Sequence, residues 1–137
     1  MHSLTDYDVK LLVAWGECLK GNRKFGQWFI DNGYPELTAL SSAINADDDA
    51  LQWLLKYYPE FAVLSNAIDG EEAAVEWLKK SKNEFLINFA SACQKDTEAL
   101  RWFIETQPKI YMRLILIIQE ILYDQAIASD DVHKLRV

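Results

Sequence analysis

The chain has 137 residues, of which 50% are hydrophobic and 26% charged, with only 5 glycines and 3 prolines. This composition excludes a disordered chain, and the scarcity of turn-forming residues disfavours a fold of many short strands. The net charge of −7 disfavours binding to nucleic acid or to an anionic membrane surface, because a polyanion would repel the protein. We expect one folded domain over residues 1–137 with neither kind of partner.

The first residues of the chain indicate a soluble, cytoplasmic protein. The stretch MHSLTDYDVK holds two aspartates and has no apolar centre, so it lacks the features of a secretory signal. The two cysteines, Cys18 and Cys93, are too few for a disulfide framework, and we expect both to be reduced and helical.

Four of the five tryptophans recur at a nearly constant interval. Trp28, Trp53, Trp77 and Trp102 are separated by 25, 24 and 25 residues, and ten residues before each lies a small residue followed by an apolar one. Self-similarity at a fixed period is typical of repeat architectures. The sequence therefore predicts a partial unit over 6–21, tryptophan-centred units near 23–45, 47–69, 70–94 and 96–123, and a tail over 126–137.

Each unit is expected to contain two short helices. Residues such as Ala50, Leu51, Trp53 and Leu54 follow an i, i+1, i+3, i+4 pattern that covers one face of a helix. The second helix of each unit carries large apolar residues at i and i+3 and smaller ones at i+6 and i+7, and prolines at 35, 59 and 108 stand near its start. Acidic residues that suit helix N-termini precede the tryptophan helices.

Helices of about nine residues are unstable alone in water, so the units must stack. We predict an all-α fold, a right-handed α-α solenoid of about four to five antiparallel helix pairs with an apolar C-terminal helix. The repeated tryptophans are expected to be core wedges rather than a platform for a ligand.

The stretch LSNAIDGEEAAVEWLKK, residues 64–80, resembles the two-helix part of an ankyrin repeat. The matching residues are Leu64, Ala67, Gly70, Val75, Trp77 and Leu78. The resemblance extends copy by copy over residues 37–104, but the ankyrin unit has 33 residues, and the roughly 8 missing residues correspond to its projecting hairpin. The TPLH signature is also absent. The resemblance implies protein binding as a role and carries over no contact residue, since the family's main contact hairpins are missing.

The most apolar window, residues 110–122, is 13 residues long and includes Arg113 and Glu120, whereas a membrane span needs about 20 residues. Two arrangements are open for this helix. Either the tail over 126–137 folds across it, or Ile110–Tyr123 forms a homodimer surface. Arg113 stands where the other copies place Leu40, Leu64 and Phe89. It either points outward after a shift of register or serves as a candidate anion contact.

Chemistry-bearing residues do not converge on a catalytic pattern. The two histidines, His2 and His133, lie at opposite ends of the chain, and the five glycines form no phosphate-binding loop. We therefore expect no catalytic residues, no cofactor and no metal.

Two surfaces are candidates for binding another protein, which is the function that we expect. The first combines tyrosines with lysines, a composition typical of recognition patches: Tyr34, Tyr57, Tyr58, Lys79, Lys80 and Lys82. The second is an acidic edge: Asp47, Asp48, Asp49, Asp69, Glu71, Glu72, Asp96 and Glu98. Packing of loop aromatics onto helix ends and solvated helix caps are the alternative explanations. Two other functions remain open, self-association through residues 110–123 and a small-ligand or enzyme pocket on the concave face near Arg113 and Asn88.

Overall fold

The computed structural model describes the backbone of residues 2–136 and the side chains of residues 2–129. Within this range all of the regular secondary structure is helical, as predicted, and there is no strand. The elements are a 3-10 helix η1 (Leu4–Asp6) and the helices α1 (Val9–Leu19), α2 (Arg23–Asp31), α3 (Pro35–Ile44), α4 (Asp48–Tyr57), α5 (Pro59–Ile68), α6 (Glu72–Ser81), α7 (Glu84–Cys93), α8 (Thr97–Thr106) and α9 (Lys109–Arg136). None of the described helices combines the length and hydropathy needed to cross a bilayer.

Helix boundaries follow the predicted start signals. Pro35 and Pro59 occupy the first turns of α3 and α5, where a missing N–H leaves no hydrogen bond unmade. The side chains of Asp47 and Asp96 cap α4 and α8 by accepting hydrogen bonds from the backbone N–H groups of Ala50 and Ala99, at 3.2 and 3.0 Å.

The turns that follow α1, α3, α5 and α7 repeat one backbone feature. Their second residues, Gly21, Ala46, Gly70 and Lys95, have φ angles of 92, 69, 86 and 67°. This left-handed conformation ends a helix sharply and reverses the chain. Its recurrence at the tryptophan period shows that the turns are repeated along with the helices.

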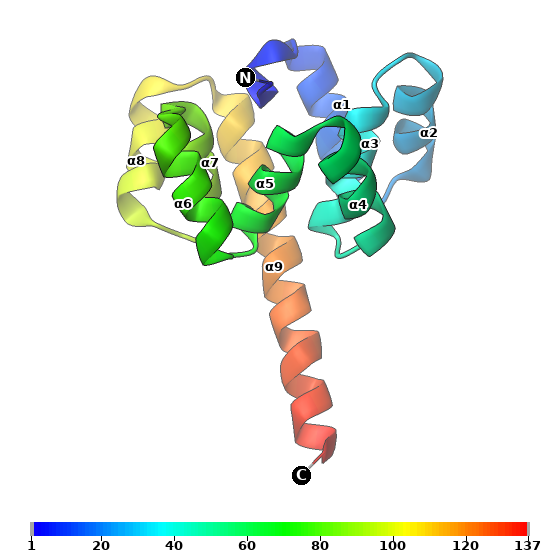
Figure 1. Ribbon diagram of the computed structural model, residues 1–137, viewed down its shortest axis with the longest axis vertical. Coiled ribbons are helices and arrows are strands. Elements are labelled where there is room, and N and C mark those ends of the chain that lie inside the picture. Colours follow the sequence, from blue (N-terminus) through cyan, green and yellow to red (C-terminus); the bar gives the residue numbers. More distant parts are fainter. Residues whose placement is uncertain (1, 137) are drawn as a thin grey trace.

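The helices form two layers. The inner layer consists of α1, α3, α5, α7 and α9, each in contact with its neighbour, and the outer helices α2, α4, α6 and α8 pack against the inner helices that flank them (Figure 1). In addition, α9 contacts both α7 and α1. The stack of helix pairs therefore closes into a ring of five inner helices, a feature that the sequence analysis did not predict.

The core repeats position by position around this ring. Each inner helix buries three apolar residues at equivalent positions. These residues are Leu12, Trp15 and Leu19 in α1, Leu37, Leu40 and Ile44 in α3, Phe61, Leu64 and Ile68 in α5, Leu86, Phe89 and Cys93 in α7, and Tyr111, Leu114 and Ile118 in α9. Because these side chains meet in one cluster, the concave face of an open solenoid is filled. The described part of the chain therefore has no open concave face, the surface on which a pocket near Arg113 and Asn88 was expected.

The prediction that the repeated tryptophans are core wedges is wrong. Trp28 and Trp77 are 46% and 45% exposed, and Trp53 and Trp102 are only partly buried. The residue after each tryptophan enters the core instead, and all four are buried: Phe29, Leu54, Leu78 and Phe103. A rotation of one residue, about 100° around the helix, moves the tryptophans to the edge of the buried face.

The C-terminal segment also differs from the expectation. The tail does not fold across the apolar helix, because α9 continues as one helix of 28 residues to Arg136 and projects from the ring (Figure 1). The first half of α9 is covered by α1, α7 and α8 instead. Arg113 is exposed, because Leu114, and not Arg113, occupies the buried position equivalent to Phe89.

Side-chain amides donate hydrogen bonds to backbone carbonyl groups at the C-terminal ends of four inner helices. Asn45 donates to Leu19 O at 3.2 Å, Gln94 to Ile68 O, Gln119 to Ala92 O at 2.9 Å and Gln125 to Ile44 O at 3.0 Å. The last carbonyl groups of a helix lack partners within it. Each amide therefore ties one inner helix to another at the end from which α9 leaves the ring.

Substitution of Gly16 in α1 tests directly whether α1 and α9 are in tight contact. A Cβ at this position would lie 3.4 Å from both Leu114 Cδ2 and Ile117 Cδ1 of α9. We expect Gly16→Leu to overpack the α1–α9 contact and to lower the free energy of unfolding by about 1–3 kcal/mol. Gly16→Ala is the control, since its single methyl group adds only these two contacts at van der Waals distance and gains helix propensity. Equal urea midpoints for the two variants would contradict a tight contact between α1 and α9.

Candidate functional site

One end of the ring, where α1, α3 and α5 begin, carries an aromatic cluster. Tyr34 and Tyr58 are the N-terminal flanking residues of α3 and α5. Tyr58 stacks on Trp53 at 5.6 Å between ring centroids, and the His2 ring lies 4.7 Å from that of Phe61. Two of the predicted contact residues, Tyr34 and Tyr58, are thus partly buried and support the fold as well as forming surface.

A buried carboxylate lies beneath this cluster. Glu36 is only 5% exposed, and its Oε2 accepts a hydrogen bond of 2.6 Å from the hydroxyl of Tyr7. Since the one hydroxyl proton of Tyr7 is committed to Glu36, His2 Nε2, 2.6 Å away, donates to the Tyr7 oxygen. The other oxygen of Glu36, Oε1, is buried and has no hydrogen-bond partner among the described residues.

Glu36 influences the pKa values of the tyrosines at this end of the ring. Burial, followed by the hydrogen bond and the charge of Glu36, raises the pKa of Tyr7 well above its usual range. Burial and the same carboxylate also raise the pKa of Tyr58. Both tyrosines therefore stay neutral at physiological pH, and neither is an activated base.

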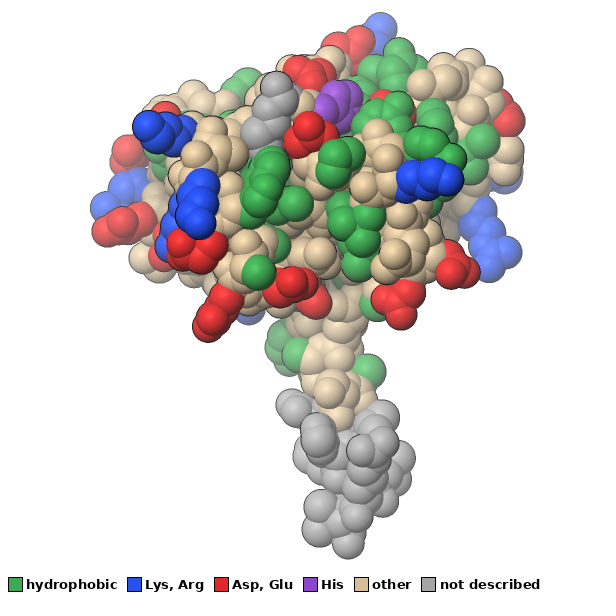
Figure 2. All heavy atoms as spheres, viewed as in Figure 1, with side chains coloured by type: hydrophobic (Ala, Val, Ile, Leu, Met, Phe, Trp, Pro, Cys, Tyr) green, Lys and Arg blue, Asp and Glu red, His purple; other side chains and the backbone are tan. Residues whose placement is uncertain are grey.

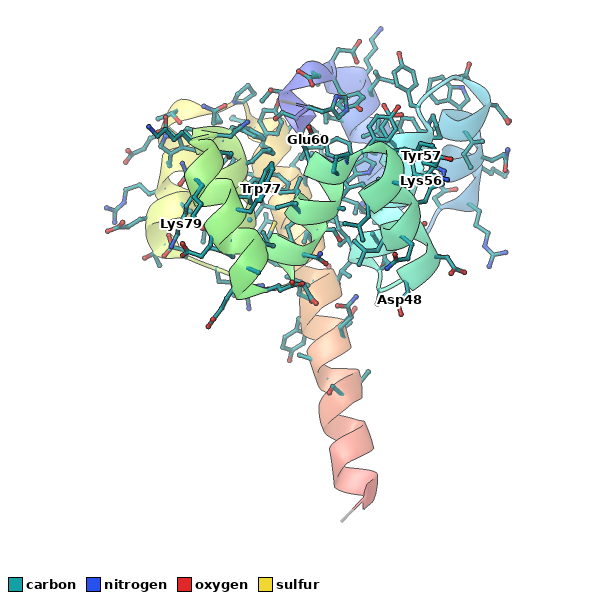
Figure 3. The ribbon with its side chains drawn as sticks, in the orientation of Figure 1. Asp48, Lys56, Tyr57, Glu60, Trp77 and Lys79 are labelled. Atoms are coloured by element: carbon teal, nitrogen blue, oxygen red, sulfur yellow. The ribbon has the colours of Figure 1, made fainter. Side chains whose placement is uncertain are left out.

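The remaining predicted contact residues are open to solvent. Tyr57, at the end of α4, is 54% exposed, and the ammonium of Lys56 lies 5.2 Å from the centre of its ring. The lysines at the end of α6, Lys79, Lys80 and Lys82, are all exposed. Figure 3 places Tyr57 on the α4 side of one molecular face and Lys79 on the α6 side of the same face.

Trp77 is a further exposed residue on this face, and it was not predicted from the sequence. Trp77 of α6 is 45% exposed and lies between Tyr57 and Lys79 on this face, with Glu60 of α5 nearby (Figure 3). Hydrophobic side chains gather over α4, α5 and α6 on this face, with lysines beside them (Figure 2). The periodic pattern of α6 allows either Trp77 or Leu78 to face the core, so no local signal in the sequence assigns Trp77 to the surface. We call Tyr57, Trp77 and Lys79 the α4–α6 face.

The predicted acidic edge lies at the opposite end of the ring, at the turns from inner to outer helices (Figure 2). Its members are all exposed: Asp47, Asp48, Asp49, Asp69, Glu71, Glu72, Asp96 and Glu98. Asp47 and Asp96 are engaged as helix caps, so part of this charge has a structural role.

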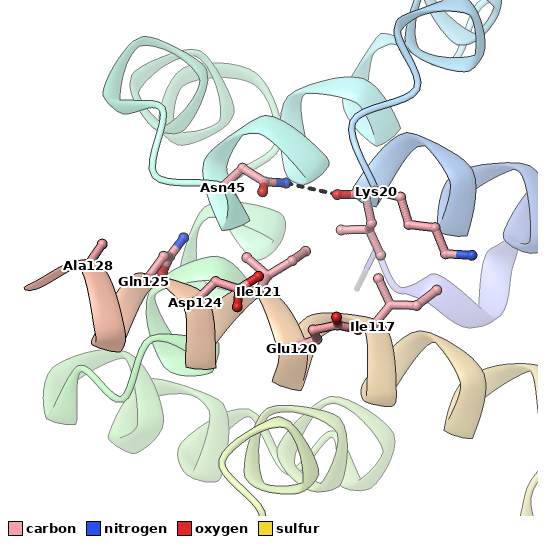
Figure 4. A pocket seen from close by; sticks show the side chains of 9 residues that line it. Lys20, Asn45, Ile117, Glu120, Ile121, Asp124, Gln125 and Ala128 are labelled. Carbon is pink, nitrogen blue, oxygen red and sulfur yellow. Dashed lines mark hydrogen bonds between the residues drawn. The ribbon is translucent and has the colours of Figure 1, made fainter.

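Recesses surround α9 where it leaves the ring at this end. One of about 570 Å³ has an apolar floor of Leu19, Ile117 and Ile121, with Lys20 and Asp124 at its rim (Figure 4). Two smaller recesses, of about 460 and 160 Å³, lie on the other sides of the helix, and Gln125 lines all three. They are shallow spaces between helix ends rather than one enclosed site.

Groups capable of metal or thiol chemistry are not assembled in the described part of the chain. No cluster there has three or more His, Cys, Asp or Glu side chains placed to hold a metal ion. Cys18 and Cys93 are free, buried thiols on α1 and α7, and burial raises the pKa of both. His133 lies outside the residues whose side chains are described.

Comparisons with family models, with curated proteins and with solved structures give no match to this chain. The sequence and the geometry of the fold therefore carry the functional argument alone.

The Tyr7–Glu36 pair gives a prediction for this end of the ring. Tyr7→Phe removes the one donor to a buried carboxylate, and we expect it to lower the free energy of unfolding by about 1–3 kcal/mol. Adding Glu36→Gln should restore part of the loss, because a neutral amide costs less to bury than an unpaired carboxylate. Chemical denaturation of the wild type, the single variant and the double variant measures these free energies of unfolding. If Tyr7→Phe left the free energy of unfolding unchanged, a stabilising role for the hydrogen bond would be ruled out.

Proposed function

We propose that the protein is a cytoplasmic protein-interaction module and that it binds its partner through the α4–α6 face. One observation carries the proposal. Tyr57 and Trp77 are large aromatic residues that remain about half exposed on the same face. Aromatic residues beside charged ones are typical of the residues that dominate binding energy in protein interfaces.

Rigidity of the support favours this assignment. Leu54 and Leu78, on the same helices as Tyr57 and Trp77, are fully or almost fully buried, so the ring fixes the positions of α4 and α6. A fixed pair of aromatic side chains loses little conformational entropy on binding, which favours affinity. The likeness of residues 64–80 to ankyrin helices agrees with protein binding as the role, although the contact residues proposed here belong to this chain alone.

The test compares variants with matched exposure. Tyr57→Ala and Trp77→Ala are expected to weaken recovery of a specific protein from the lysate of the native cell, each by about tenfold in affinity. Trp28→Ala is the control, because Trp28 has nearly the same exposed fraction, 46%, but lies on α2. Tyr58 is left unchanged, since its stacking on Trp53 belongs to the fold.

Quantitative mass spectrometry of the captured proteins gives the result. A protein recovered by the wild type and by Trp28→Ala, and lost from both face variants, would support the proposal. Equal recovery by all four proteins, or no specific protein with the wild type, would contradict it.

A further inference from the structure

The ring leaves one gap between neighbouring inner helices without an outer helix. The outer helix α2 packs on α1 and α3, α4 on α3 and α5, α6 on α5 and α7, and α8 on α7 and α9. Between α9 and α1, which also contact each other, no described helix occupies the outer position. We call this space the fifth gap.

Equivalent residues show what the fifth gap lacks. Val13, Thr38 and Ala62 occupy the same position in α1, α3 and α5, at spacings of 25 and 24 residues. The hydroxyl of Thr38 donates to Gly26 O of the preceding outer helix at 2.7 Å, and Ala62 is fully buried. Val13 has no preceding outer helix and is 44% exposed, and Val9, one turn earlier, is 57% exposed.

The other wall of the gap is the outward face of α9. Leu116 on this face is 55% exposed, followed along the helix by Glu120, Tyr123 at 58% and Ile127 at 42%. The intervals of four, three and four residues are those of a heptad seam, which keeps one stripe of a helix against a partner helix. The seam runs from the ring onto the projecting part of α9 (Figure 1). Where it leaves the ring, the ammonium of Lys95 lies 5.9 Å from the centre of the Tyr123 ring, and Tyr123 nevertheless stays 58% exposed.

We propose that a second copy of this chain supplies the missing outer helix. The projecting part of α9 from one copy lies in the fifth gap of the other, and the exchange is reciprocal about a two-fold axis. The orientation agrees with the fold, because each outer helix runs antiparallel to the inner helices beside it, and an antiparallel pair of identical helices is compatible with two-fold symmetry. Residues 123–136 are about 21 Å long as a helix, enough to fill an outer position.

One register of this antiparallel pair matches the chemistry of the seam. Leu116 of one copy faces Ile127 of the second copy, so that apolar residues meet twice across the axis. Glu120 then faces Tyr123 of the second copy, whose hydroxyl can donate to the carboxylate. In the same register Arg113 faces position 130, which is aspartate in the sequence. Self-complementarity of apolar groups and of charge is what favours a second copy over an unrelated partner.

The alternative homodimer through Ile110–Tyr123 is different from this one. The apolar residues Ile110, Leu114, Ile115 and Ile118 are buried within the ring and are not available to a second copy. The proposed seam uses the opposite, exposed side of the same helix and extends beyond it to Ile127.

Sedimentation equilibrium from micromolar to submillimolar concentration tests the proposal. The wild type is expected to dimerise, and Leu116→Asp and Ile127→Asp are each expected to raise the dimer Kd by more than about tenfold, because each places a carboxylate against an apolar side chain. Ile104→Asp is the control. Ile104 of α8 is 71% exposed and lies outside the seam, so this variant should dimerise like the wild type.

A charge exchange tests the register. Arg113→Asp should weaken the dimer by placing like charges opposite each other, and Asp130→Arg in the same chain should restore it. A wild type that is monomeric throughout, or a dimer that survives both aspartate variants, would overturn the proposal. Failure of the second change to restore the dimer would overturn the register. Ile104, Arg113, Leu116 and Ile127 are exposed, and circular dichroism checks that the variants keep their helicity.

Discussion

The contact between α1 and α9 is the constraint on which the rest of this architecture depends. Gly16 allows Leu114 and Ile117 to approach the backbone of α1, and this approach joins the first inner helix to the last. An open solenoid must protect an apolar face at each end, usually with polar capping repeats. Here the two end faces cover each other. The apolar character of residues 110–118 is explained by this burial, and the lack of a polar cap follows from it.

Closure of the ring also allows short helices to form a stable fold. Helices of 9–11 residues, the lengths of α1 to α8, have marginal stability in isolation because nucleation is costly. In the ring each inner helix packs against two inner neighbours, and amides from Asn45, Gln94, Gln119 and Gln125 satisfy carbonyl groups at the ends of four of them. The two ends of the ring consequently differ in chemistry. One carries helix C-termini, amides and acidic turns, and the other carries aromatic residues over Glu36.

Much of this fold could be predicted from the sequence because the repeat period is expressed in local signals. The prolines that open α3 and α5, the aspartates that cap α4 and α8 and the recurring apolar spacing each act within one turn of a helix. The errors arose where a tertiary contact decided the outcome. Whether Trp77 or Leu78 enters the core depends on a rotation of α6 that the periodic pattern allows either way. The Tyr7–Glu36 hydrogen bond joins residues 29 positions apart, and no local pattern signals it.

The candidate surfaces show the same difference between features set by local sequence and features set by tertiary contacts. Tyr57 and the lysines of α6 could be assigned to one edge because turns between helices alternate between the two ends of any such stack. The partial burial of Tyr34 and Tyr58 could not be predicted in this way. It results from the N-terminal segment, whose His2 ring lies near Tyr58 and whose Tyr7 ring lies near Tyr34. Closure of the ring needed knowledge of the curvature of the stack, which accumulates from small rotations between successive helix pairs and has no signature in any single unit.

Closure is tested most directly by measuring the distance between α1 and α9. Spin labels on cysteines introduced at Lys10 and Lys109 mark the starts of these helices, and labels at Glu84 and Lys109 mark the neighbouring pair α7 and α9 at equivalent positions. The buried thiols of Cys18 and Cys93, whose pKa values are raised by burial, should resist labelling, and dilution with unlabelled protein removes contributions between copies. A closed ring predicts that both pairs give similar, narrow distance distributions in double electron–electron resonance, since both join adjacent helices about 8–10 Å apart. A Lys10–Lys109 distance longer than the Glu84–Lys109 distance by roughly 25–30 Å would contradict the closed ring, because the first and last helices of an open row of five are four interhelical spacings apart and not one.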